Sequence, residues 1–313
     1  MTATTRHSGP APTIGQRISF LLARILLFPA THLPYPLALA SVWPVARLVW
    51  CIPSLRRRTR RRLLQVFGDS LPPRELRRIG WRAFRNFVFT AIDAIRLPTV
   101  TPAWIAARMD TPGTELLESA LSEGRGVIVA VPHLGSWELA GLALLAKGYP
   151  FLTFFRRQRN PVVNDWVYRT RARTGMEVID VQSRAAVRAG RTIAEKNCTL
   201  VITPDLRAKT GGYTVTFLGH PTQLPCGPAH YALDANCPVI TAEVYRTSWT
   251  RHAWRVTGTI RPDPTRPRAE EGRRILQYIA DRFTESIRRR PDNYFWFNGR
   301  WVLGPEEKRP RKP

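Results

Sequence analysis

Two residue types that support acid–base chemistry follow a short apolar run near the middle of the chain. The run at 127–131 has the small and β-branched side chains of a buried strand, and Pro132 ends it. His133 and Glu138 come next, with four residues between them. A histidine oriented by a nearby carboxylate is a general base for a hydroxyl group. The residue types therefore predict that His133 removes the proton of an attacking alcohol.

The elements around this pair are expected to hold it at one edge of a sheet. Ser136 has the side chain of an N-cap for an apolar helix over 137–147, and Gly148 is a typical helix stop. His133 would then lie beyond the carboxyl end of a strand, where open α/β sheets bind their ligands. Two structural interpretations stay open: His133 as a helix cap, and Glu138 as an acid that favours the positive helix end.

A group of arginines follows the next expected strand, at 151–155. Arg156, Arg157 and Arg159 would lie at the same sheet edge as the histidine, where guanidinium groups can hold phosphate oxygens. In an arginine-rich chain the same residues could equally form a solvated loop.

A second carboxylate follows another expected strand, at 199–203. Asp205 would project toward the same edge and could orient His133, either with the first glutamate or in its place. The alternative is a local ion pair of Asp205 with Arg207 or Lys209.

Strand and helix patterns alternate from residue 113 onward, which predicts an α/β fold. We expect a mostly parallel central sheet with helices on both faces, late antiparallel strands, and an apolar N-terminal helical segment before it. Helices fill 56–112. Beyond 113 the expected strands are 127–131, 151–155, 176–181, 199–203, 214–218, 239–245 and 254–260, and the expected helices are 114–123, 137–147, 161–174, 184–196, 228–235 and 268–289. The aromatic run at 294–301 could line an acyl groove or complete the core, and we interpret it as core.

The composition indicates an anionic binding partner or an anionic membrane surface. The 313 residues include 48 Lys and Arg against 23 Asp and Glu, a net charge of +25. Nucleic acid, anionic lipid, an acidic carrier and phosphorylated substrates all suit such a charge. The four cysteines, Cys51, Cys198, Cys226 and Cys237, show no CxxC pairing, which argues against a zinc site and a disulfide framework and favours a reduced, cytosol-facing location. No glycine-rich nucleotide loop precedes a helix.

The N-terminal region indicates a membrane. Residues 1–13 read as a disordered tail, and 14–55 as a membrane-associated apolar segment without a formal charge between 25 and 46. Four prolines interrupt this segment, so it could be a broken spanning helix, a hairpin in one leaflet, or a buried hairpin of a soluble protein. The basic cluster at 56–62 favours membrane attachment, because it suits anionic lipid on the cytoplasmic side. Residues 304–313 read as a flexible tail.

The ordered set of these segments resembles the lipid A biosynthesis late acyltransferase family, of the lauroyl/myristoyl type, within the lysophospholipid acyltransferase superfamily. The similarity extends over residues 15–303, with an acyltransferase domain at 56–303. Its motifs are the H-x4-E pattern in 132–138, Arg156, Asn160-Pro161, Pro204-Asp205, 217–219 followed by 227–229, Trp296 and Arg300-Trp301.

The resemblance implies an enzyme at the cytoplasmic face of the bacterial inner membrane. It would move a fatty acyl chain from a thioester of acyl carrier protein or coenzyme A to a hydroxyl of an anionic glycolipid such as a lipid A precursor, with no metal or further cofactor. His133 would be the base, Glu138 its acidic partner and Asp205 a possible second acid. The expected substrate contacts are Arg156, Arg159, Asn160, Gly135 and Ser136.

Three points stay open at this stage. Actinobacterial phosphatidylinositol mannoside acyltransferases share the pattern, and the turn at 206–212 departs from many relatives, so the acceptor is not fixed by the sequence. A thioester hydrolase or an amine acyltransferase acting on an amino-acid lipid would have the same fold. The rival class is a non-enzymatic basic protein that binds nucleic acid or coats anionic membranes, although no nucleic-acid motif or aromatic stacking pattern supports a nucleic-acid partner. For the enzyme, backbone N–H groups near Gly135 are the expected oxyanion donors.

Overall fold

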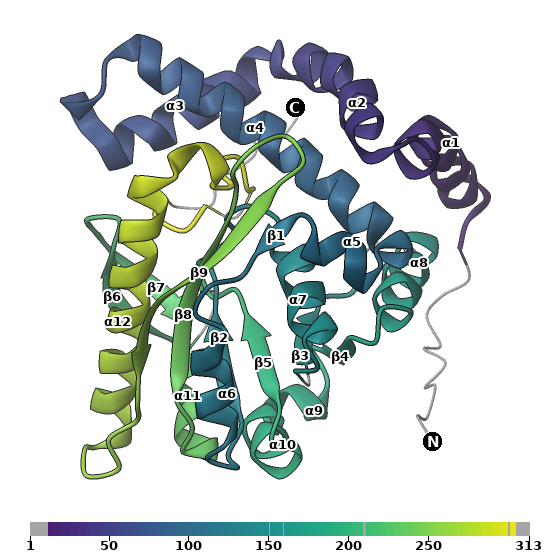
Figure 1. Cartoon of the computed structure of the whole chain (residues 1–313). Coiled ribbons are helices and arrows are strands. Elements are labelled where there is room, and N and C mark those ends of the chain that lie inside the picture. Colours follow the sequence, from purple (N-terminus) through teal and green to yellow (C-terminus); the bar gives the residue numbers. More distant parts are fainter. Residues whose placement is uncertain (1–11, 150, 159, 209–210, 300, 305–313) are drawn as a thin grey trace.

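A seven-stranded sheet forms the centre of the computed structural model, which describes residues 12–149, 151–158, 160–208, 211–299 and 301–304 (Figure 1). The strand order is β1-β9-β8-β2-β5-β3-β4. The strands are β1 (Met109–Asp110), β2 (Val127–Ala130), β3 (Phe151–Phe155), β4 (Glu177–Asp180), β5 (Thr199–Ile202), β8 (Val239–Arg246) and β9 (His252–Ile260). The strands β8, β2, β5, β3 and β4 are parallel, and β9 is antiparallel to β8. The predicted fold class is confirmed.

Helices cover both faces of this sheet because its central strand is apolar on both sides. Ile128 and Ala130 pack into one core with α10, α11 and α12, whereas Val127 and Val129 pack into another with α6 and α7. This division follows from the two-residue period of a strand. The helices of this region are α6 (Glu115–Leu121), α7 (Trp137–Ala146), α8 (Pro161–Ala172), α9 (Arg184–Val187), α10 (Ala189–Lys196), α11 (Gly227–Ala235) and α12 (Arg268–Arg289).

The structure corrects the sequence reading in three places. The strand expected at 214–218 is β6 (Gly212–Phe217), and it pairs with a strand that the sequence did not reveal, β7 (His220–Pro225). This hairpin is a separate two-stranded sheet. The short β1 was also missed. The helix expected at 184–196 is divided into α9 and α10, because Arg188 leaves the helical conformation.

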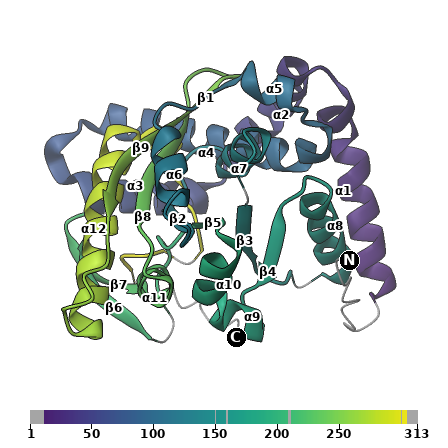
Figure 2. The same cartoon turned by 60° about the horizontal axis from the view of Figure 1, so that its bottom comes forward.

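The N-terminal helices form a layer over the carboxyl edge of the sheet (Figure 1). They are α1 (Ile14–His32), α2 (Tyr35–Trp50), α3 (Pro53–Phe67), α4 (Pro73–Arg96) and α5 (Pro102–Ala106), with short 3-10 turns η1 (Gly68–Ser70) and η2 (Leu97–Thr99). Figure 2 shows α1 beside α8, where Phe20 meets Trp166 edge to face. Within the described residues, no single helix has the length and apolarity to cross a membrane, and only α2 with α3, bent by 86°, passes that test as a pair.

The first two helices leave a large apolar surface without a partner. Among the described residues, eleven of the fifteen exposed large hydrophobic side chains lie between Ile14 and Ile52. The opposite sides of α1 and α2 pack on α4 through Tyr35, Leu39 and Phe89. One face of this layer therefore belongs to the core, and the other is an unpartnered apolar face.

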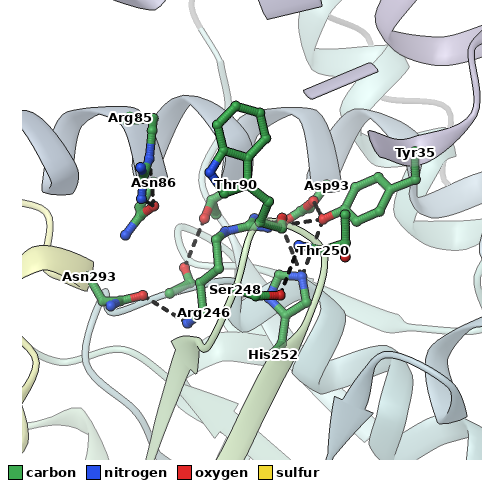
Figure 3. Close-up of polar contacts among 12 residues, drawn as sticks. Tyr35, Arg85, Asn86, Thr90, Asp93, Arg246, Ser248, Thr250, His252 and Asn293 are labelled. Carbon is green, nitrogen blue, oxygen red and sulfur yellow. Dashed lines mark hydrogen bonds and ion pairs between the residues drawn. The ribbon is translucent and has the colours of Figure 1, made fainter. Parts of the chain in front are cut away.

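A buried polar cluster fastens this layer to the sheet (Figure 3). Asp93 on α4 accepts hydrogen bonds from Tyr35 at 2.6 Å and from Arg246, at the end of β8, at 2.5 Å. Arg246 also donates to the Tyr35 oxygen at 3.1 Å, and His252 Nε2 lies 3.3 Å from that same oxygen. These four side chains come from α2, α4, β8 and β9, so the cluster fixes the N-terminal helices relative to the strands. We call it the anchoring cluster.

Candidate active site

His133 and Asp205 meet at the carboxyl edge of the sheet. His133 follows β2 and Asp205 follows β5, and these two strands are parallel neighbours. His133 Nδ1 lies 2.6 Å from Asp205 Oδ1, and the His133 backbone N–H donates to Oδ2 at 2.9 Å. The aspartate side chain is 1% exposed and the imidazole 16% exposed. The carboxylate therefore holds both the ring and the backbone of the histidine.

This contact determines which nitrogen of His133 is free. An ionised carboxylate only accepts, so Nδ1–H donates to Asp205 and Nε2 keeps its lone pair. Burial lowers the pKa of His133, but the charge and hydrogen bond of Asp205, with a smaller contribution from the charge of Glu138, outweigh it and raise this pKa above 6.5. The arrangement is that of a general base with an orienting acid.

Tyr294 is a member of this site that the sequence reading assigned only to the core. Burial, together with the charge of Asp205 and the interaction of the hydroxyl with that carboxylate, raises the pKa of Tyr294 well above 10. Its ring packs against Trp296 and Trp301, so the core interpretation of this run is confirmed. The available signal was a single hydroxyl in a run of buried aromatics, because a buried tyrosine oxygen requires a partner.

The C-terminal segment also holds the loop that carries His133. Phe295 N–H donates to the His133 carbonyl at 3.2 Å, and Gly135 N–H donates to the carbonyl of Asn293, the last residue of η3 (Pro291–Asn293), at 3.0 Å. Gly135 has φ +63°, and a Cβ there would lie 2.4 Å from the Val244 carbonyl oxygen, so only glycine fits. Of the backbone N–H groups near Gly135 that are expected as oxyanion donors, the N–H of Gly135 itself is already used in this bond.

The anchoring cluster reaches the same loop. Arg246 N–H donates to Asn293 Oδ1 at 2.8 Å, and the Thr90 hydroxyl donates to the Gly135 carbonyl at 3.2 Å (Figure 3). Ser136 is buried, its Oγ has no partner among the described residues, and it makes no capping bond to α7. Ser136 is therefore the N-cap residue of α7 as predicted, but its side chain does not cap the helix, and hydrogen bonds of the neighbouring backbone hold the loop.

Glu138 lies in the first turn of α7, as expected, but its carboxylate contacts a different partner. It forms a short ion pair with Arg171 of α8, and Arg171 in turn lies over the Phe155 ring at 5.8 Å. Of the two acids considered from the sequence, the structure places Asp205 in contact with the imidazole, while Glu138 acts on it through charge alone.

A cavity of about 840 Å³ opens in front of His133. Asp205 lies behind the ring and is not part of this cavity wall. The wall is mostly apolar and includes Trp137, Phe151, Phe155, Met176 and Tyr231. Its size and lining suit an apolar chain that ends at the histidine.

The basic residues at this edge differ in their surroundings. Arg156 is exposed, lines the cavity and forms no ion pair with another described residue, whereas Arg157 pairs with Asp180 at 2.6 Å. Asn160 accepts from Val162 N–H and donates to the Gln16 carbonyl, so its amide caps α8 and joins it to α1. Arg159 and Lys209 lie outside the described residues.

The described part of the chain holds no group of three or more His, Cys, Asp or Glu side chains that could bind a metal. Its four cysteines are free thiols, of which Cys198 and Cys237 are buried.

Comparison with known proteins gives a consistent family. The model of the bacterial lipid A biosynthesis acyltransferase family matches residues 13–302. Phosphatidylinositol mannoside acyltransferase of Mycolicibacterium smegmatis is 26% identical over 69% of this chain and 70% of its own length. The protein of that name from Mycobacterium tuberculosis H37Rv is 23% identical over 97% of this chain and 81% of its own. A lipid A biosynthesis acyltransferase of Haemophilus influenzae is 36% identical over 22% of this chain and 21% of its own.

Proposed function

The chain belongs to the bacterial lipid A biosynthesis acyltransferase family, and we propose that it moves a fatty acyl chain from a thioester to a hydroxyl of a glycolipid with His133 as general base. That it is an acyltransferase acting on lipid follows from the family and its relatives. One observation carries the role of the base: the ring of His133 is held from behind by Asp205 and lines a large apolar cavity in front.

The proposed reaction has two proton transfers through one nitrogen. Nε2 of His133 takes the hydroxyl proton while the acceptor oxygen attacks the thioester carbonyl carbon. The tetrahedral intermediate then expels the thiolate, the C–S bond breaks, and the imidazolium returns the proton to sulfur. The new ester and a free thiol balance the atoms without a covalent acyl-enzyme. Asp205 stabilises the imidazolium that forms between the two steps.

The remaining polar residues are assigned supporting roles. Asp205 is the main partner of His133, Tyr294 positions that carboxylate, and the Glu138–Arg171 pair forms part of the cavity wall. With the Gly135 N–H already bonded, oxyanion stabilisation falls to the first turn of α7, whose Trp137 and Glu138 line the cavity.

The cavity divides substrate binding into an apolar part and a charged part. The apolar walls are proposed to hold the acyl chain, where each buried CH₂ contributes about 0.8 kcal/mol. Arg156 and Arg207 also line the cavity, and they are proposed to contact phosphates of the acyl donor or of the acceptor. Acyl carrier protein and coenzyme A both bring such phosphates, and either is a suitable donor.

Two acceptors are consistent with the family. The relatives that cover most of this chain are named phosphatidylinositol mannoside acyltransferases, whereas the lipid A relative covers about a fifth of it. The larger share of this chain that these relatives cover therefore favours a mannosylated phosphoinositide over a lipid A precursor as the acceptor. The apolar face of α1 and α2, with the basic start of α3, supports a location at the cytoplasmic face of the bacterial inner membrane.

Acyl transfer by the purified protein tests this proposal. Radiolabelled palmitoyl-coenzyme A and palmitoyl-acyl carrier protein are each supplied with either acceptor in detergent, and the labelled lipid is identified by mass spectrometry. We expect His133→Ala to lose transfer by at least a factor of about 100. The matched control is His220→Ala, since the His220 ring contacts the Gln65 carbonyl and does not line the cavity. Transfer by His133→Ala at the control rate would exclude His133 as the base.

A further inference from the structure

A second hollow lies where α2, α3 and α4 meet, outside the cavity at His133. Its volume is about 300 Å³. Trp50, Leu63 and Leu76 supply apolar walls, and Pro53, the first residue of α3, also lines the hollow. Four arginines complete the lining, Arg56, Arg57 and Arg60 from α3 and Arg77 from α4. We call this hollow the arginine cleft.

The positive charge of the arginine cleft is not compensated within the described structure. No hydrogen bond or ion pair joins the side chains of its four arginines to another described residue, and all four are exposed. Residues 53–92 contain eleven arginines, with only Asp69 and Glu75 as acids. Glu75 is bonded to Arg78, which is not part of the cleft, at 2.8 Å. Guanidinium groups gathered without acids attract an anion.

The position of these arginines on α3 strengthens this field. The first turn of α3 has no acid, and Arg56 and Arg57 lie near the helix start. The N-terminal end of a helix carries partial positive charge, so basic side chains are unfavourable there in the absence of an anion. Arg62, from the same basic run, has a different role, because it is buried and donates to the carbonyls of Trp296 and Asn298.

An apolar strip lies at the end of α2 that reaches the arginine cleft. Leu48 is 73% exposed and Ile52 48% exposed, and in the chain these residues precede and follow Trp50, which lines the cleft. Val45 and Val49 are exposed on the same helix. A ligand that satisfies both surfaces carries a phosphate and adjacent hydrocarbon. The continuity of this strip with the unpartnered apolar face of α1 and α2 favours a lipid over a folded acidic protein, which would need about 800 Å² of complementary surface.

We propose that the arginine cleft binds the phosphate headgroup of an anionic phospholipid whose acyl chains lie along α2. This lipid is not a substrate, and its site is separate from the cavity at His133. The site goes beyond the proposed function, because it fixes the orientation of α2 and α3 on an anionic bilayer and adds a headgroup preference to membrane attachment.

Binding to vesicles tests the proposal without turnover. The full-length protein is sedimented with phosphatidylcholine vesicles and with vesicles that contain 30% phosphatidylglycerol. The cleft variant is Arg57→Gln/Arg60→Gln/Arg77→Gln. The control variant, Arg188→Gln/Arg191→Gln/Arg273→Gln, removes the same charge from three exposed arginines: Arg188 is the N-cap residue of α10, Arg191 lies on α10 and Arg273 lies on α12. We expect phosphatidylglycerol to increase wild-type binding, the cleft variant to lose about 10-fold in affinity for these vesicles, and the control to lose less than 3-fold.

A soluble probe separates a headgroup site from general charge attraction. Dihexanoyl phosphatidylglycerol below its micellar concentration is expected to raise the Tm of the wild type but not of the cleft variant, and dihexanoyl phosphatidylcholine to raise neither. Circular dichroism and transfer in detergent verify that the cleft variant is folded. Equal vesicle affinities for the two variants would overturn the proposal. So would an equal Tm increase with inorganic phosphate, which indicates a free-phosphate site, or loss of acyl carrier protein binding with vesicle binding intact, which indicates a protein site.

Discussion

Two histidines of this molecule lie beside buried aspartates, and only one has the surroundings of a base. Asp205 contacts His133 Nδ1 directly at 2.6 Å, with the ring open to the cavity. In the anchoring cluster Arg246 binds Asp93, and His252 Nε2 stays 3.9 Å from that carboxylate. The two sites therefore share a histidine beside a buried aspartate. They differ in the position of the nearest positive charge relative to that aspartate.

The electrostatic consequence is opposite in the two regions. Burial lowers the pKa of His133, but the charge and hydrogen bond of Asp205 outweigh it and raise this pKa above 6.5. Burial, reinforced by the charge of Arg246, lowers the pKa of His252 to about 4, although Asp93 opposes this. His252 Nδ1 has no partner among the described residues. A buried His–Asp neighbourhood thus becomes a base only when the carboxylate has no other cation and the ring faces a substrate space.

The largest expected effect separates the two acids near His133. Asp205→Asn removes the charge that stabilises the imidazolium and allows the wrong tautomer, so kcat is expected to fall by about 10³. Glu138→Gln leaves the His133–Asp205 contact intact and is expected to lower kcat by about 10-fold or less, through cavity shape. Steady-state transfer kinetics for the two variants measure the difference. The reverse order would make Glu138 the main partner of His133.

The anchoring cluster is expected to respond in stability rather than in chemistry. Asp93→Asn leaves Arg246 charged and buried without its partner, which costs about 3–5 kcal/mol of unfolding free energy. Asp165→Asn is the control, because Asp165 and Arg169 form an exposed pair worth less than about 1 kcal/mol. Urea unfolding gives both values. A loss below 1 kcal/mol for Asp93→Asn would show that this cluster does not anchor the N-terminal helices.

Acid pH is expected to probe the same cluster through His252. Its folded pKa of about 4 lies below the unfolded value of 6.5, so the unfolded chain binds the proton first as the pH falls. The contribution of His252 to stability is present above pH 6.5 and is lost between pH 6.5 and 4, up to about 3 kcal/mol.

Replacement of His252 isolates this contribution. In His252→Gln the stability lost between pH 7 and pH 4.5 is expected to be smaller than in the wild type, measured by urea unfolding at each pH. Identical pH dependence in the two proteins would mean that His252 titrates normally in the folded state. His133 contributes with the opposite sign, because its raised pKa gives stability that is lost as the pH rises above 6.5.

The sequence predicted the helices and strands better than it predicted which side chains contact one another. Apolar periodicity located the strands on both sides of His133, and their parallel pairing brings Asp205 to it. Periodicity could not show that Glu138 forms an ion pair with Arg171, because this contact depends on how α8 packs. The Asp93–Arg246 pair joins residues far apart in the chain and carries no local pattern. The strand β7 was missed because prolines at 221 and 225 interrupt it, which an edge hairpin tolerates.

Tyr294 gives the smallest and most specific effect. Tyr294→Phe keeps the ring among Trp296 and Trp301 but removes the donor to Asp205. The carboxylate then holds the His133 proton more strongly, so less of the free base is present at neutral pH. We expect kcat to fall about 10-fold with KM unchanged, and the acid limb of the kcat–pH profile to move to higher pH.

The shift of the pH profile distinguishes positioning from packing. A purely structural role for the hydroxyl would lower stability and leave the pKa of His133 unchanged, so the acid limb would stay in place. Tyr278→Phe is the matched control, because Tyr278 lies on α12 beside Arg282 and does not contact Asp205. Arg246 is the partner of Asp93, whereas Tyr294 is the partner of Asp205. A cation beside one aspartate and a neutral donor beside the other would explain why the pKa of His252 is lowered and that of His133 is raised. An unmoved acid limb in Tyr294→Phe would leave the charge of Asp205 alone as the cause.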